Sequence, residues 1–101
     1  MIDIKIEKHK NLLTLSALGH AGYAPCGSDI VCAGVSSIIM GLCASLDDKH
    51  SETHISSGKA VIRTRHSRRA EYTFRFAEKA LGLIAAEYPA HVRLSVNINA
   101  R

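Results

Sequence analysis

The chain has 101 residues, of which 47% are hydrophobic and 5% aromatic, and its net charge is +4 at pH 7. This length allows one aliphatic core without metal or disulfide support, so we expect a single domain over residues 1–101. No apolar run reaches the roughly 20 residues that cross a bilayer, and no signal peptide is visible, which predicts a cytoplasmic protein with no membrane partner.

The hydrophobic pattern predicts two strands at the start of the chain. Isoleucines alternate with polar residues over 2–7, as in a half-buried strand. A polar turn over 8–11 and a second alternating stretch over 13–17 complete a predicted hairpin. The following segment, 21–28, contains Gly and Pro without periodicity and is predicted to be a loop.

A helix is predicted to begin after Asp29, which is a good N-cap residue, and to end at Asp47. Its apolar face is expected to consist of Val31, Val35, Ile38, Leu42 and Leu46. Gly34 and Gly41 also lie in this helix, and each costs about 1 kcal/mol relative to alanine. We therefore expect a strand, another helix or a second subunit to approach closely there.

The second half of the chain predicts three more strands. Two of them, over 50–56 and 60–65, are joined by a turn signal at 57–59. Alternation over 92–98 predicts the last strand.

A second helix is predicted from about Arg69 to Pro89, because apolar residues repeat there every 3.6 positions. The element order is then ββαββαβ. It predicts an α+β two-layer sandwich in which two helices cover one face of a five-stranded sheet.

A histidine at a strand end and a cysteine at a helix start are joined by the predicted loop. If Asp29 caps the helix, Cys32 lies in the first turn, where unpaired N–H groups favour a thiolate. His20 can then take the thiol proton and later protonate a leaving amine. Asp29 can also orient the histidine, and Ser36, one turn further, can add a hydrogen bond. The N–H groups of Cys32 and Ala33 are candidate oxyanion donors. A buried, inert cysteine is the structural alternative.

The Gly-His pair and the later Asp-Ile-Val-Cys-Ala string within 19–34 resemble the ribosomal-processing cysteine protease family, Prp. The resemblance extends over the whole chain in length and element order. It implies a catalytic dyad of His20 and Cys32, with Asp29 and Ser36 as supporting residues. We expect no cofactor and no metal.

The resemblance also implies a substrate and an assembly. Members of this family remove an N-terminal extension from large-subunit ribosomal protein twenty-seven, and they form homodimers whose His-to-Cys loop is mobile until peptide binds. The expected protein is thus a hydrolase, a thiol protease of ribosome biogenesis. The alternative is a non-catalytic module that holds a peptide or ribosomal component in the same groove.

The three cysteines are odd in number and lack CxxC spacing, which argues against a secreted disulfide framework. Cys26 stands in the loop where relatives commonly carry polar residues. Three roles are open for it, in this order: an inert thiol, a disulfide partner of Cys32, or a metal ligand with His20 and Cys32. Cys43 is interpreted as core packing.

Positive charge is concentrated in one cluster, which consists of Arg63, Arg65, His66, Arg68 and Arg69. Such a cluster can meet RNA phosphates, but no interleaved aromatic motif accompanies it, so we favour a solvated corner and leave direct nucleic-acid binding open. A weak metal candidate shares one predicted strand face and consists of His50, Glu52 and His54. The remaining histidines, including His91, are expected at the surface.

Overall fold

The computed structural model describes the backbone of residues 1–98. Its elements are β1 (Ile2–His9), β2 (Leu12–Leu18), α1 (Ile30–Ala44), a 3-10 turn (Asp48–His50), β3 (Ser51–Ser56), β4 (Lys59–Arg65), α2 (Arg68–Glu87) and β5 (Val92–Ile98). The predicted order ββαββαβ and the α+β class are therefore confirmed.

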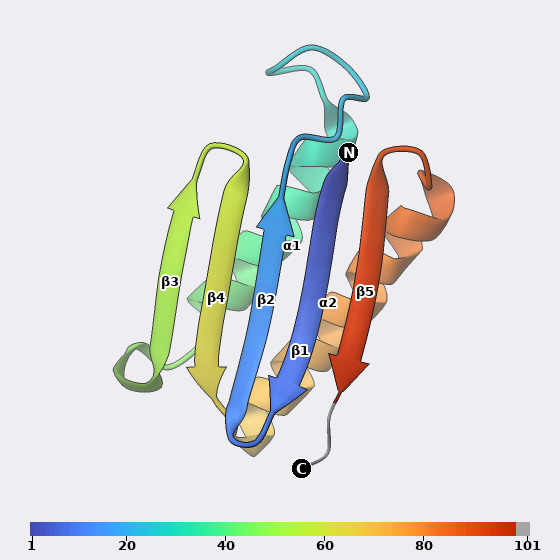
Figure 1. Cartoon of the computed structure of the whole chain (residues 1–101). Coiled ribbons are helices and arrows are strands. Elements are labelled where there is room, and N and C mark those ends of the chain that lie inside the picture. The colour runs from blue at the N-terminus through green and yellow to red at the C-terminus, as the bar shows by residue number, and fades with distance from the viewer. Residues whose placement is uncertain (99–101) are drawn as a thin grey trace.

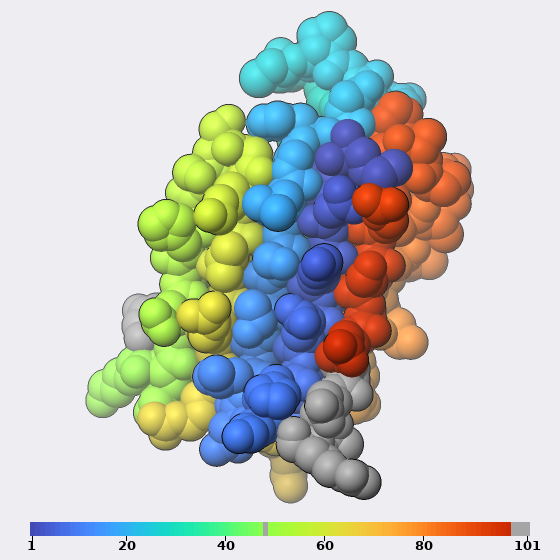
Figure 2. Space-filling view, viewed as in Figure 1, coloured from blue at the N-terminus to red at the C-terminus, as the bar shows by residue number. Residues whose placement is uncertain are grey.

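The five strands form one mixed sheet in the order β3-β4-β2-β1-β5. β1 and β5 are parallel, while the pairs β1–β2, β2–β4 and β3–β4 are antiparallel. Both helices lie on the same face of the sheet, as predicted (Figure 1). The opposite face carries no helix and is seen directly in the space-filling view (Figure 2).

The core lies between the helices and the inner face of the sheet. Alternating residues of β1 point into it, and Ile4 and Ile6 are each 1% exposed. α2 contributes Phe74 and Leu81 from its buried face, at the predicted helical spacing. Burial of such aliphatic and aromatic side chains contributes roughly 1.5–3 kcal/mol each and accounts for most of the driving force for the fold.

The apolar face of α1 differs from the prediction at two residues, because Ile39 joins it and Leu46 lies beyond the end of the helix, where it still packs against the core. Ile39 is buried in the core, whereas the predicted Ile38 is half-buried, packs against the core and also lines a hollow between the two helices. Adjacent residues are about 100° apart around a helix, so a broad apolar face leaves either residue a plausible core member. The helix also ends at Ala44, three residues earlier than expected.

The two glycines of α1 have different surroundings. A Cβ on Gly34 would lie 3.5 Å from Cδ1 of Ile84, so this glycine does lie at a contact with α2. Among the described residues, nothing lies within 4 Å of the corresponding position on Gly41. The expected close approach is therefore found at the first glycine and not at the second within this chain.

The predicted metal candidate is not assembled on a strand. His50 lies in the 3-10 turn before β3, and its Nδ1 is 3.0 Å from a carboxylate oxygen of Asp47. Glu52 and His54 follow on β3. No group of three His, Cys, Asp or Glu side chains with the geometry for a metal ion occurs within the described part of the chain.

The elements that carry the His-Cys segment meet at one end of the sheet, where strands terminate. β2 and β3 end there and α1 begins there. The end of β4 and the start of α2, which carry the basic cluster, lie at the opposite end of the sheet (Figure 1).

Within residues 1–98, neither helix has the length and apolar character needed to cross a membrane.

Candidate active site

His20 lies immediately beyond the end of β2 and is exposed. The preceding residue, Gly19, has a φ of +101° and donates its N–H to the carbonyl oxygen of Gly58 at 2.9 Å. A Cβ at Gly19 would overlap the carbonyl oxygen of Met1. Only glycine fits both the backbone conformation and this close approach, so it fixes where the chain leaves the strand.

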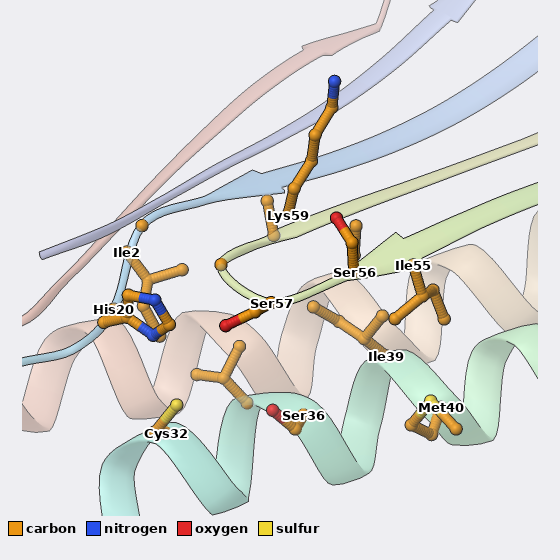
Figure 3. Close-up of a pocket in the computed structure, with 15 residues that line it drawn as sticks. Ile2, His20, Cys32, Ser36, Ile39, Met40, Ile55, Ser56, Ser57 and Lys59 are labelled. Carbon is orange, nitrogen blue, oxygen red and sulfur yellow. The ribbon is translucent and has the colours of Figure 1, made fainter. Parts of the chain in front are cut away.

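Cys32 is the third residue of α1 and is half-buried. Its sulfur points out of the first helical turn toward the region of His20, as Figure 3 shows. The strand end and the helix start therefore bring the two residues predicted to form the dyad to the same site. Among the described residues, no hydrogen bond joins the His20 ring and the Cys32 thiol. In active sites without substrate, catalytic hydrogen bonds are often long and form only when substrate binds.

Two hollows meet at these side chains. One has a volume of about 230 Å³ and the other about 550 Å³. Four residues line both of them: His20, Cys32, Ser36 and Ser57. Cys32 and His20 thus border both hollows.

The two hollows have different walls. The smaller lies between α1 and the end of β3, where its apolar residues include Ile39, Met40 and Ile55 (Figure 3). The larger lies under the loop and is lined by Cys26 and Asp29, among others. An extended chain crossing Cys32 would therefore meet an apolar wall on one side and the loop on the other.

Asp29 connects the helix and the loop through its two carboxylate oxygens. Oδ1 accepts the N–H of Cys32 at 2.9 Å, and Oδ2 accepts the N–H groups of Tyr23 at 3.0 Å and Ala24 at 3.3 Å. These bonds, that from Cys32 first, lower the pKa of Asp29 below its ordinary value of 3.8. The predicted capping role is present in the structure. The role of orienting His20 stays a prediction, since the hydrogen bonds of Asp29 within residues 1–98 go to backbone N–H groups.

The backbone donors expected to stabilise an oxyanion are already engaged. The N–H of Cys32 bonds the Asp29 side chain, and the N–H of Ala33 bonds the Asp29 carbonyl oxygen at 3.0 Å. The expectation for these two groups is therefore wrong, because the capping residue satisfies the first N–H groups of the helix. Ser36 and Ser57 line both hollows beside Cys32, so their hydroxyls are candidate oxyanion donors.

Comparison with known proteins identifies the family. The family model for the cysteine protease Prp matches residues 1–93. The chain belongs to the Prp family. It is accordingly a cysteine protease, and the alternative of a non-catalytic binding module is set aside.

Solved structures agree with this family in fold. The ribosomal processing protease Prp from S. aureus, in complex with a covalently linked product peptide, superposes with a TM-score of 0.85 at 25% identity, covering 95% of this chain and 99% of that one. SMU.848 from Streptococcus mutans gives a TM-score of 0.72 at 21% identity, covering 98% and 96%. A comparison of the sequence with curated proteins found no match.

The other cysteines of this Prp family member are separate thiols. Cys26, Cys32 and Cys43 are all unpaired, so the structure contains no Cys26–Cys32 disulfide. Cys26 is exposed in the loop, and Cys43 is half-buried with its sulfur 3.3 Å from the Thr53 hydroxyl oxygen. Cys43 packs against the core as expected.

Sequence reasoning missed two contributors to this Prp site. The first is the turn between β3 and β4, where Ser57 and Gly58 line the smaller hollow. The turn signal was visible, but its position beside His20 follows from the strand order. The second is His91, which is half-buried rather than at the surface, with Nδ1 2.9 Å from the Ala21 carbonyl oxygen.

Proposed function

We propose that this protein is an endopeptidase that removes the N-terminal extension of large-subunit ribosomal protein twenty-seven, with Cys32 as nucleophile and His20 as general base and then general acid. The observation that carries the proposal is that both side chains border the same two hollows. The S. aureus ribosomal processing protease, which shares this fold, was crystallised with a covalently linked product peptide. A thiol that forms a covalent bond to peptide suits this arrangement.

The first half of the reaction forms a thioester. His20 takes the proton of Cys32, and the sulfur attacks the scissile carbonyl carbon to give a tetrahedral oxyanion. Ser36 and Ser57 supply hydroxyl donors to that oxyanion. The protonated imidazole then gives its proton to the leaving amine, the C–N bond breaks, and the C-terminal fragment departs.

Water completes the reaction. His20 takes a proton from water as its oxygen attacks the thioester carbon, and a second tetrahedral oxyanion forms. Collapse of this intermediate breaks the C–S bond, and the Cys32 sulfur leaves with the proton from the imidazole. The extension is released with a new carboxylate, and the free enzyme is restored.

The two hollows suit an extended peptide. The smaller hollow, bordered by Ile39, Met40 and Ile55, suits an apolar side chain beside the scissile bond. Met40 and Ile55 are 55% and 46% exposed, which leaves apolar surface for a peptide to cover. We further propose that the enzyme acts in the cytoplasm, where ribosomal proteins are made, and that it works as a homodimer.

The test is cleavage of ribosomal protein twenty-seven from the same organism, followed by intact mass spectrometry. Wild type should shorten the protein at its N-terminus, and Cys32→Ser should not. Cys43→Ser is a matched control, because Cys43 is a half-buried cysteine of the same helix that lines neither hollow. Equal cleavage by wild type and Cys32→Ser would overturn the assignment of the nucleophile. If wild type leaves ribosomal protein twenty-seven uncut, the assignment of this protein as the substrate is overturned.

A further inference from the structure

The imidazole of His20 lies against the turn between β3 and β4, at a residue that has no side chain. A Cβ placed on Gly58 would be 2.8 Å from Nε2 of His20, 3.4 Å from Cε1 and 3.5 Å from Cδ2. All three atoms belong to the ring, so a side chain at this position would meet the imidazole itself rather than its stem. Any other residue at this position would have to displace the ring.

The backbone of the same glycine holds the chain next to His20. The carbonyl oxygen of Gly58 accepts the N–H of Gly19 at 2.9 Å. Gly58 therefore bears on His20 in two ways: its carbonyl oxygen holds the N–H of the preceding residue, Gly19, and its lack of a side chain leaves room for the ring. The hydrogen bond holds the chain where it leaves β2, and the missing side chain of Gly58 leaves the place that the ring occupies beside the turn.

The turn also lies above the thiol. Ser57, which precedes Gly58, and His20 both lie on the side of the hollow facing Cys32 (Figure 3). Ser57 and Gly58 line the smaller hollow with His20 and Cys32. A ring pushed away from the turn would move relative to the sulfur, and a misplacement of about 1 Å can cost on the order of a hundredfold in rate.

We propose that Gly58 is a positioning residue that fixes the imidazole of His20 over Cys32. The inference rests on the proposed function, because it assumes that His20 exchanges a proton with the thiol. It adds a third segment, distant in sequence from the His-Cys motif, to the parts that make the site work. Gly58 has no side chain and takes no part in the proton transfer itself; it acts through the position of the His20 ring.

A second reason for glycine must be separated from this one. The φ of Gly58 is +72°, a left-handed conformation that favours glycine with or without a neighbour. A strain effect is independent of the residue at position 20, whereas a clash with the ring disappears when the ring is removed. A double-mutant cycle between Gly58→Ala and His20→Ala therefore distinguishes them.

The cycle has two readouts, the rate of Cys32 alkylation by iodoacetamide and the melting temperature. We expect Gly58→Ala to slow alkylation about tenfold or more when His20 is present and less than about twofold when position 20 is alanine. The loss of Tm should likewise be smaller in the alanine background. Gly27→Ala serves as a strain control for Tm only, since Gly27 has a φ of +90° and, among residues 1–98, no atom within 4 Å of a Cβ placed on it.

Equal losses from Gly58→Ala in both backgrounds would overturn the positioning role and leave the proposed function intact. If His20→Ala alone leaves the alkylation rate unchanged, the proposed function of His20 fails, whatever the Tm coupling. The wild-type protein gives an independent check by NMR, where cross-relaxation between the Gly58 α-protons and the His20 ring protons is expected. If Gly58→Ala alone does not fold, the double variant with His20→Ala decides: a folded double variant supports the proposal, and an unfolded one overturns it. A missing NMR contact between Gly58 and the His20 ring in wild type also overturns it.

Discussion

The carboxylate of Asp29 accepts the backbone N–H of Cys32 at 2.9 Å while its other oxygen holds the N–H groups of Tyr23 and Ala24. One side chain therefore caps the helix that carries the nucleophile and folds the loop back toward it. A short motif can therefore organise this site, because Asp29, three positions before Cys32, connects the loop to the first turn of α1.

Two substitutions separate the two roles of Asp29, which are to cap α1 and to hold the loop. Asp29→Asn keeps one carbonyl oxygen to cap Cys32 but replaces an acceptor of Tyr23 and Ala24 with an NH₂ donor. We expect near wild-type Tm and faster amide hydrogen exchange in the loop. Asp29→Ala should lose both roles and lower Tm by several degrees. Equal exchange in wild type and Asp29→Asn would contradict the assignment of the second oxygen to the loop.

The engaged N–H groups of α1 lead to a prediction about hydroxyls. We expect Ser36→Ala, Ser57→Ala or both to lower kcat, by on the order of a hundredfold for a serine that donates to the oxyanion. Ser37→Ala is the control, because the Ser37 hydroxyl donates to the Ala33 carbonyl oxygen at 2.8 Å and lines neither hollow. Peptide cleavage kinetics check this, and unchanged kcat in both variants would show that another group stabilises the oxyanion.

Most of the fold could be predicted from the sequence, because strand alternation and helical spacing are local signals. The strand order could not, since the pairing of β1 with β5 joins residues about ninety positions apart in register, such as Ile2 and Val92. The motif also predicted that His20 and Cys32 lie at one site, while their catalytic roles stay a proposal. Gly58 could not be assigned to the site, because a turn signal says nothing about which side chain will lie against the turn.

The loop is held by aromatic contacts at its start. The Tyr23 ring lies edge-on to Tyr88 and to His91, with centroids 5.4 Å apart in each pair. Such contacts contribute about 0.5–1.5 kcal/mol each, so Tyr23→Ala should raise amide exchange in the loop by about tenfold and raise KM. Tyr72→Ala is the control, because Tyr72 is an exposed residue of α2. Unchanged exchange in Tyr23→Ala would mean that the hydrogen bonds of Asp29 and His91 hold the loop without the aromatic contacts.

A second carboxylate, far from the site, sets part of the acid stability. Glu71 bonds Nε2 of His66 at 2.8 Å and Nζ of Lys8 at 3.0 Å, and these bonds lower its pKa from 4.5 to about 2. A carboxylate whose pKa is lowered on folding stabilises the folded state at pH values above its ordinary pKa. This stabilisation is lost as the pH falls through the lowered pKa.

The resulting prediction concerns the pH dependence of Tm. Between pH 4.5 and about 2, wild type should lose more Tm than Glu71→Gln, which has no charge to lose. The exposed Glu87, at the end of α2, provides the control variant Glu87→Gln, which should follow wild type. Parallel acid profiles for wild type and Glu71→Gln would refute this contribution.

The most direct measurement of the central claim is the alkylation rate of each cysteine, followed by peptide mapping in wild type and in His20→Ala. Cys26 is exposed and Cys32 is half-buried, so exposure alone would make Cys26 react first. If Cys32 is the nucleophile activated by His20, it reacts faster than Cys26, and only its rate falls when the imidazole is removed. Labelling that follows exposure, with no effect of His20 on Cys32, would contradict the account.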